Sequence, residues 1–134
     1  MNDPTALVQD TMPLCSTLGI TASVFTPDQV TLEVAWSPEL CTAGGILHGG
    51  LLMTLADSAG ASCAFLNLPE GSAGTSTIES KTNFIGAVTA GVVTATARPL
   101  HTGRSTIVVE TEVRDEAERL VAKTIQTQAV IHPR

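Results

Sequence analysis

Two titratable side chains stand alone in the middle of the chain. Between Glu39 and Glu70, thiols aside, the only acid or base residues are His48 and Asp57. An ionised carboxylate is costly to bury among apolar residues unless it has a partner, so Asp57 has either a structural partner or a chemical role. A position facing solvent or a subunit interface is the alternative, and isolation alone leaves both interpretations open.

Two glycines directly follow His48, in the motif Leu47-His48-Gly49-Gly50. At the start of a helix, backbone N–H groups have no intrahelical acceptor and lie at the positive end of the helix dipole. A carbonyl oxygen bound to such N–H groups would be polarised, and an oxyanion would be stabilised. The alternative is an ordinary glycine-rich helix start, in which His48 caps the helix or packs against it.

The spacing of Gly49 and Asp57 limits how they can work together. Eight residues on one helix separate them by roughly 12 Å, so they cannot contact one carbonyl group within one subunit. If both act on one substrate, two subunits must lie with these helices side by side and antiparallel. The sequence therefore predicts a homodimer with two shared sites, each using Asp57 of one chain and Gly49 of the other.

The element that must carry these residues is a long helix, predicted over residues 50–66. This segment contains no proline, is apolar nearly all round and is followed by helix breakers, which is typical of a helix buried on several sides. Small residues such as Gly60 would let other backbones approach it closely. A shorter amphipathic helix is predicted over residues 5–18, although Pro13 weakens it.

Most of the remaining chain is rich in Thr, Val and Ile and is predicted to form strands. Two strands precede the long helix and four follow it, with short turns at 102–103 and 116–119. The predicted strands are 20–25, 29–36, 74–84, 91–101, 105–115 and 120–131. This order predicts an α+β fold, in which a curved antiparallel sheet of five to six strands wraps around the helix and the last four strands form a meander.

Composition and charge restrict the class of protein. We expect residues 1–134 to form one domain, with residues 1–18 as an N-terminal helical segment. A formal charge of −6 and a pI near 4.8 argue against nucleic acid as a partner. Polar residues interrupt the apolar segments, so no membrane association is expected. The N-terminus lacks a basic region followed by an apolar run, which favours a cytoplasmic protein without a secretory signal.

Neither the cysteines nor the histidines are spaced like metal ligands. The odd number of cysteines favours reduced thiols. The residues concerned are Cys15, Cys41, Cys63, His48, His101 and His132. No glycine-rich loop has a nucleotide-binding form, so we expect neither a metal nor another cofactor.

The motifs around the long helix resemble the signature of the PaaI-type hotdog-fold acyl-CoA thioesterases. The matching segments are Gly45-Ile46-Leu47-His48-Gly49-Gly50 and Leu55-Ala56-Asp57-Ser58-Ala59. Residues 77–84, Gly91 and the hairpin 101–104 are similar as well, and the likeness covers about residues 20–131. It implies a hotdog fold and the hydrolysis of a CoA thioester to a free acid and CoA, without a cofactor. Dimers of dimers are common in this family.

The resemblance also implies roles around the thioester. Gly49 would supply the N–H that polarises the carbonyl, and Gly50 would contribute to binding the substrate. His48 would position the thioester or its own loop. Asp57 of the partner chain would be the nucleophile or the general base that activates water, since a carboxylate in an apolar setting is a stronger base.

Further roles concern the water and the coenzyme. Thr77 would match a hydroxyl residue that assists the water or the carboxylate. Arg104, with Arg98 or Lys81, would lie near the nucleotide and phosphates of coenzyme A. One position departs from the family, because many relatives have an asparagine where this chain has Thr42. A threonine hydroxyl has a shorter reach and only one donor, so the geometry of the catalytic water would differ.

Three functions are compatible with these features. The leading prediction is an acyl-CoA thioesterase that acts on an aryl, phenylacetyl-type or medium-chain fatty acyl group. A non-catalytic hotdog module that binds acyl-CoA is the alternative; Thr42 favours it and Asp57 argues against it. A hotdog dehydratase is a weaker option, because such sites pair a catalytic histidine with an acid in a different motif.

Overall fold

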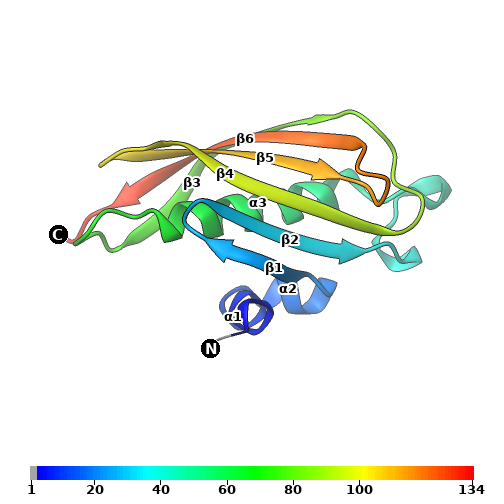
Figure 1. Cartoon of the computed structure of the whole chain (residues 1–134), viewed down its shortest axis with the longest axis horizontal. Helices are drawn as coiled ribbons and strands as arrows, with labels where there is room; N and C mark the ends of the chain where they lie inside the picture. The colour runs from blue at the N-terminus through cyan, green and yellow to red at the C-terminus, as the bar shows by residue number, and fades with distance from the viewer. Residues whose placement is uncertain (1–2) are drawn as a thin grey trace.

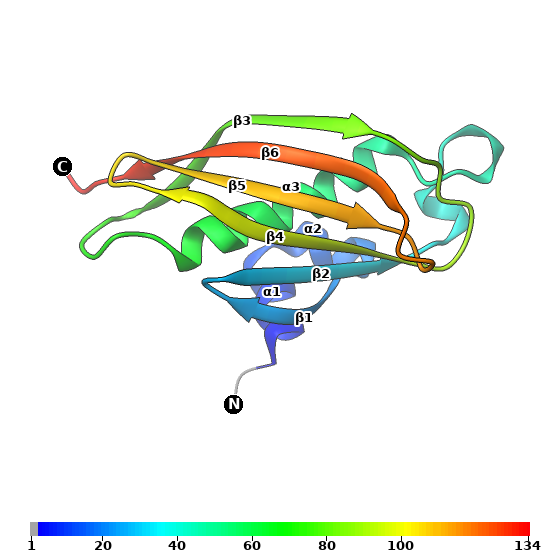
Figure 2. The same cartoon turned by 45° about the horizontal axis from the view of Figure 1, so that its top comes forward.

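A six-stranded antiparallel sheet curves around one long helix in the computed structural model, which describes residues 3–134 (Figure 1, Figure 2). The strands are β1 (Thr21–Thr26), β2 (Gln29–Ala35), β3 (Gly74–Phe84), β4 (Val92–Thr102), β5 (Thr106–Arg114) and β6 (Leu120–Ile131). The helices are α1 (Pro4–Thr11), α2 (Pro13–Leu18) and α3 (Gly49–Leu66), with short 3-10 turns at Pro38–Leu40 and Ala43–Gly45. The predicted curved sheet and long helix are confirmed.

The core lies between α3 and the face of the sheet that α3 covers. On β5, every second residue is buried, including Ile107, Val109 and Val113, while the residues between them are partly exposed. This alternation follows from the pleat of a strand with one face on the core. On β6 the same pattern buries Gln126 and Gln128, which are polar exceptions in an aliphatic core.

The long helix begins at Gly49, one residue before the predicted start. Among residues 3–134 it is the one helix long and apolar enough to cross a membrane by length and composition, with a mean hydropathy of 1.3. More than half of that window, 56%, is buried inside the fold. Its apolar side chains therefore form the core against the sheet.

Two short helices replace the single helix predicted over 5–18. Pro13 has no N–H to continue a helix, and its ring disfavours helical backbone at the preceding residue, so α1 stops before Met12 and α2 starts at Pro13. Gly19 ends α2 with φ 74°, as expected for a glycine cap. Of the predicted segment 1–18, residues 1–2 lie outside the described residues.

Side-chain hydrogen bonds tie α1 to the start of the sheet. The Thr5 hydroxyl accepts from Ala22 N at 2.9 Å, and Gln9 Nε2 donates to the Ile20 carbonyl at 2.9 Å. Both bonds fix the helix against β1 and the residue before it. These hydrogen bonds therefore hold α1 in place beside the sheet.

The predicted four-strand meander is wrong for one strand. The sheet order is β1-β2-β4-β5-β6-β3, so only β4, β5 and β6 form a meander, and β3 pairs with β6 at the far edge. A strand has two edges, and β2 and β5 occupy both edges of β4. Strand β3 therefore cannot lie beside β4 and instead pairs with the free edge of β6.

Asp115, which was predicted to end the strand 105–115, lies one residue beyond β5 and holds the turn between β5 and β6. Its Oδ1 accepts from the backbone N–H groups of Ala117 at 3.0 Å and Arg119 at 2.8 Å, and Arg119 Nε donates to Oδ2 at 2.9 Å. The hydrogen bond from the Arg119 backbone is the largest cause that lowers the pKa of Asp115, and the Arg119 side chain adds to it.

Candidate active site

His48 caps the first turn of α3. Its Nδ1 accepts a hydrogen bond from Gly50 N at 2.8 Å, and its carbonyl accepts from the N–H groups of Leu51 and Leu52. An accepting Nδ1 carries no proton, so the ring proton is assigned to Nε2 of this exposed side chain. The structure therefore shows the alternative in which His48 caps the helix, and His48 Nδ1 occupies the N–H of Gly50.

The backbone N–H of Gly49 is a free hydrogen-bond donor at the start of α3. Within residues 3–134, no acceptor takes a hydrogen bond from Gly49 N. A Cβ on this residue would lie 3.2 Å from two ring carbons of Phe84, a half-exposed side chain at the end of β3. One backbone N–H at the positive end of α3 is thus available to a carbonyl oxygen beside an aromatic ring.

Asp57 lies two turns further along α3 and is held by the sheet. Gln126 Nε2 donates to its Oδ1 at 2.9 Å, and the Thr77 hydroxyl lies at the long distance of 3.5 Å from the same oxygen. Within residues 3–134, nothing donates to Oδ2. The structure therefore brings Thr77 to Asp57, fixes one carboxylate oxygen and leaves the other available.

The polar contacts continue into the sheet. Gln128 Nε2 donates to the Thr77 hydroxyl at 2.6 Å, and the Thr75 hydroxyl donates to Gln128 Oε1 at 3.0 Å. Sequence reasoning missed Gln126 and Gln128. The available signal was two amides at alternate positions of a strand whose alternate residues face the core.

Gly60 makes room for Gln126. A Cβ on Gly60 would lie 1.8 Å from Gln126 Oε1, which is closer than any real contact. Gly60 was predicted to let another backbone approach the helix, but the group that approaches is a side-chain amide. That Gln126 Oε1 is buried and has no hydrogen-bond partner within the described chain.

A β-bulge in β3 turns two hydroxyl side chains towards Asp57. The register shifts between Thr77 and Glu79, so that Thr77 pairs with Gln128 and Ser80 pairs with Gln126. Paired residues of adjacent antiparallel strands lie on the same face, which here is the face covered by α3. Without the bulge, residues three apart would point to opposite faces.

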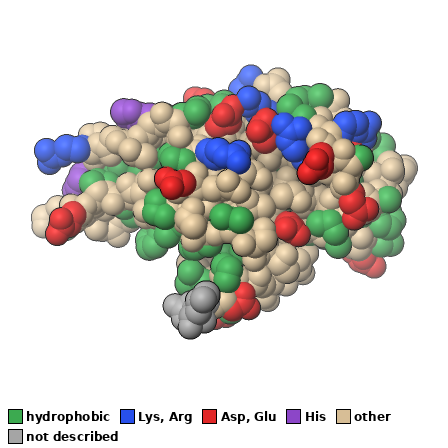
Figure 3. All heavy atoms as spheres, viewed as in Figure 1, with side chains coloured by type: hydrophobic (Ala, Val, Ile, Leu, Met, Phe, Trp, Pro, Cys, Tyr) green, Lys and Arg blue, Asp and Glu red, His purple; other side chains and the backbone are tan. Residues whose placement is uncertain are grey.

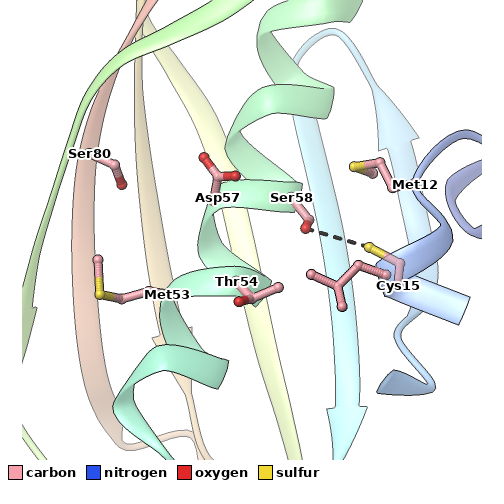
Figure 4. A pocket seen from close by; sticks show the side chains of 8 residues that line it. Met12, Cys15, Met53, Thr54, Asp57, Ser58 and Ser80 are labelled. Carbon is pink, nitrogen blue, oxygen red and sulfur yellow. Dashed lines mark hydrogen bonds between the residues drawn. The ribbon is translucent and has the colours of Figure 1, made fainter. Parts of the chain in front are cut away.

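An open cavity of about 400 Å³ lies over Asp57, between β3 and α2 (Figure 4). Figure 4 shows Asp57 on the side of α3 towards Ser80, and Ser58 on the side towards α2, where the Cys15 thiol donates to it at 3.5 Å. The lining residues are Met12, Leu14, Cys15, Met53, Thr54, Asp57, Ser58 and Ser80. Asp57 is the only acidic or basic side chain among them, the Cys15 thiol aside, so the cavity suits a largely apolar group next to a carboxyl group.

The predicted coenzyme-binding residues Lys81 and Arg98 are not beside this cavity in one chain. They lie at the two ends of one cross-strand row, in which Arg98 pairs with Glu110, Glu110 with Ile125 and Ile125 with Lys81. The row faces away from α3, because the neighbours of Ile125 along β6 are the buried ones. Figure 3 shows basic and acidic side chains interspersed over the molecule, without a separate basic patch on the face in view.

Arg104 and Thr42 lie in loops. Arg104 is in the β4–β5 connection, where His132 Nε2 donates to its carbonyl at 2.8 Å. Thr42 is exposed and donates its backbone N–H to the Ile46 carbonyl at 2.8 Å, in the loop before α3. Within residues 3–134, no hydrogen bond joins either residue to Asp57.

Cys15, Cys41 and Cys63 form no disulfide in the structure. Burial, with a smaller effect from the charge of Asp28, raises the pKa of the Cys63 thiol to about 11. Cys63 is therefore protonated and unsuited to act as a nucleophile. Among residues 3–134, no group of three His, Cys, Asp or Glu side chains is placed to hold a metal ion.

Comparisons with known proteins agree on one family. The sequence model of the thioesterase superfamily matches residues 44–122. The 1,4-dihydroxy-2-naphthoyl-CoA hydrolase of Listeria monocytogenes is 32% identical over 119 residues, which cover 89% of this chain and 96% of that protein. A solved thioesterase from Haemophilus influenzae is 28% identical, with a TM-score of 0.89, and the match covers 98% of this chain and 92% of that one. A solved thioesterase family protein from Silicibacter pomeroyi is 25% identical, with a TM-score of 0.85 and 98% coverage of both chains.

Proposed function

Because this hotdog-fold chain belongs to the thioesterase superfamily, we propose that it is an acyl-CoA thioesterase of the PaaI type. The free N–H of Gly49 carries the proposal, since an unoccupied donor at a helix start is what a thioester carbonyl requires. The Asp57 carboxylate, with one oxygen held and one free, supplies the basic group. The acyl-CoA hydrolase of Listeria monocytogenes among its relatives supports a CoA thioester as the substrate.

The reaction is a hydrolysis with two protein groups at the reacting atoms. Gly49 N–H binds the carbonyl oxygen, which becomes an oxyanion when oxygen attacks the carbonyl carbon. In one route Asp57 takes a proton from the attacking water, the carbon–sulfur bond of the oxyanion intermediate breaks, and the thiolate takes that proton to leave as CoA. In the other route Asp57 attacks the carbonyl carbon, and the carbon–sulfur bond breaks to release the thiolate and leave an anhydride. Water then hydrolyses this anhydride, which frees the acid, restores Asp57 and supplies the proton of the CoA thiol. His48 contributes by capping α3 and by presenting Nε2–H near the thioester.

Two subunits complete each site in this proposal. Gly49 and Asp57 are eight residues apart on the continuous helix α3, which separates them by roughly 12 Å. Strand β3 lies at the edge of the sheet, next to α3. Its side chains Ile78 and Phe84 are exposed, and so is Ile85, the residue just beyond its end. A second copy that pairs with this edge covers these apolar side chains and sets the two α3 helices antiparallel.

The decisive test compares two substitutions at Gly49. Gly49→Pro removes the N–H at the first helical position, where proline is tolerated, and His48 already has the extended φ −62°, ψ 134° that a residue before proline prefers. Release of free thiol from a panel of acyl-CoA esters should fall by roughly 10²–10³ in kcat. Gly49→Ala is the matched control, because it keeps the N–H and makes a similar contact with the movable ring of Phe84.

Three outcomes decide between the functions. Equal activity of the proline and alanine variants contradicts the role of the Gly49 N–H. An Asp57→Ala variant as active as the unmodified protein contradicts the role of the carboxylate. If the protein binds CoA esters but hydrolyses none, it is the acyl-CoA-binding module.

A further inference from the structure

A second cavity follows the first along α3. It has a volume of about 330 Å³ and lies between α1, β1 and the C-terminal half of α3. None of its ten lining residues is charged. Its apolar walls include Leu7, Met12, Phe25, Ala61, Phe65 and Leu66.

One stripe of α3 lines both cavities. Asp57 and Ser58 line the first cavity, and the second is lined by Ala61 and Ser62 and then by Phe65 and Leu66. Steps of four residues remain on one side of a helix, so these pairs form a continuous line. Met12, in the link between α1 and α2, contributes to both cavities. Met12 therefore lies between the two cavities, which follow one another along the same side of α3 from Asp57 to Leu66.

We propose that the second cavity receives the distal half of an unbranched aliphatic acyl chain, so that the substrate is a medium-chain acyl-CoA of about eight to ten carbons. This inference rests on the proposed function, because it places the thioester carbonyl at Asp57. From Asp57 to Phe65 the helix rises roughly 12 Å, eight residues at 1.5 Å each. An extended chain with carbon–carbon bonds of about 1.5 Å advances roughly 1.3 Å per carbon, which gives the proposed length.

The chemistry of the walls favours an alkyl chain over an aryl group. An apolar, uncharged wall stabilises methylene groups in proportion to the area removed from water. A phenylacetyl ring ends roughly 6 Å beyond its carbonyl and fits within the first cavity, so it leaves the walls beyond Ala61 without contact. Helix α1, which forms the outer side of the second cavity, is held in position by its hydrogen bonds to β1 and to the residue before β1.

The test fills the second cavity and follows the acyl-chain preference. Ala61→Phe places a ring in the cavity, and Ala6→Phe, at an exposed position of α1 outside both cavities, is the matched control. The kcat/KM of the unmodified protein should be at least about tenfold higher for decanoyl-CoA than for butyryl-CoA. Ala61→Phe should lose at least about tenfold with decanoyl-CoA, and less than about twofold with butyryl- and phenylacetyl-CoA. The control should match the unmodified protein.

A second variant tests the same cavity from the side of α1, in case Ala61→Phe does not fold. Leu7→Trp narrows the cavity from α1, at a side chain that is 43% exposed and so tolerates a larger group. It should produce the same selective loss if Ala61→Phe does not fold. Three results would overturn the inference. They are an equal loss of activity with all three esters, a variant whose only change is loss of the dimer, and an unmodified protein without a preference for decanoyl-CoA.

Binding of decanoate, measured by calorimetry, separates the inference from the proposed function. If no ester is hydrolysed but decanoate binds the unmodified protein and not Ala61→Phe, the proposed hydrolysis fails and the alkyl site stands. If phenylacetyl-CoA is hydrolysed and decanoate does not bind, the hydrolysis stands and the alkyl site fails.

Discussion

At the scale of single residues, Asp57 is oriented from one side. Gln126 from β6 and Thr77 from β3 both contact Oδ1, and the Thr77 hydroxyl is itself held by Gln128. The Thr77 hydroxyl, at 3.5 Å, and the Gln126 amide, at 2.9 Å, both lie on the Oδ1 side of the carboxylate. The carboxylate thus presents Oδ2 in a defined direction, as a general base or nucleophile requires.

The contact between Gly60 and Gln126 gives a prediction at this scale. In Gly60→Ala, the new Cβ would displace the Gln126 amide from Asp57. We expect kcat for thioester hydrolysis to fall by about tenfold or more, and the free energy of unfolding to fall by about 1–3 kcal/mol from overpacking. Steady-state kinetics and urea unfolding measure the two effects.

A double variant separates crowding from positioning. Gly60→Ala combined with Gln126→Ala relieves the crowding, so the free energy of unfolding should recover in part while kcat stays low. If kcat recovers together with stability, Gln126 does not position Asp57.

At the scale of elements, the order of the strands decides which side chains meet. The bulge in β3 directs both Thr77 and Ser80 to the side of α3, and pairing of β3 with β6 sets Thr77 beside Gln128. A β3 strand next to β4, as a simple meander requires, would not face the glutamines of β6. The contacts of Asp57 therefore depend on how β3 joins the sheet.

The β5–β6 turn gives a prediction with a pH dependence. The lowered pKa of Asp115 means that its ionised form stabilises the folded state, an effect present above the unfolded value near 3.8 and lost as the pH falls through the folded value. Asp115→Ala should therefore lower the Tm at pH 7, and the difference should shrink below about pH 4. Thermal unfolding between pH 3 and pH 7 measures it. A difference in Tm that is equally large at pH 3 would show that the ionised carboxylate is not its cause.

At the scale of the whole molecule, the proposed site belongs to two chains. In a 1:1 mixture of Gly49→Pro and Asp57→Ala chains that exchange freely, about half of the dimers are mixed, and one of the two sites in each has both native groups. The mixture should recover about a quarter of the unmodified activity, although each variant alone is nearly inactive. Thiol release after refolding the chains together measures this recovery.

The matched control is a mixture of Asp57→Ala with Asp57→Asn chains, in which no site has a native carboxylate. It should remain inactive. Activity of the first mixture that stays at the level of the separate variants would show that each subunit holds its own complete site.

Local patterns in the sequence determined most of the elements. The apolar run that ends before Pro69 predicted α3 to within one residue, because helix periodicity and breakers act over a few residues. Alternation of Thr, Val and Ile predicted the strands in the same way. Asp57 and Gly49 were identified as candidates by their isolation and spacing, and the family was recognised from the motifs around them.

Only the tertiary structure decided which groups surround Asp57. Gln126 is 69 residues from Asp57 in the chain, so no local pattern could place its amide on that carboxylate. The position of β3 beside β6, the capture of the Gly50 N–H by His48 and the second cavity beside Met12 likewise depend on packing and hydrogen-bond geometry. Such contacts are fixed by competition between all available partners in the folded chain, and this competition is absent from any short stretch of sequence.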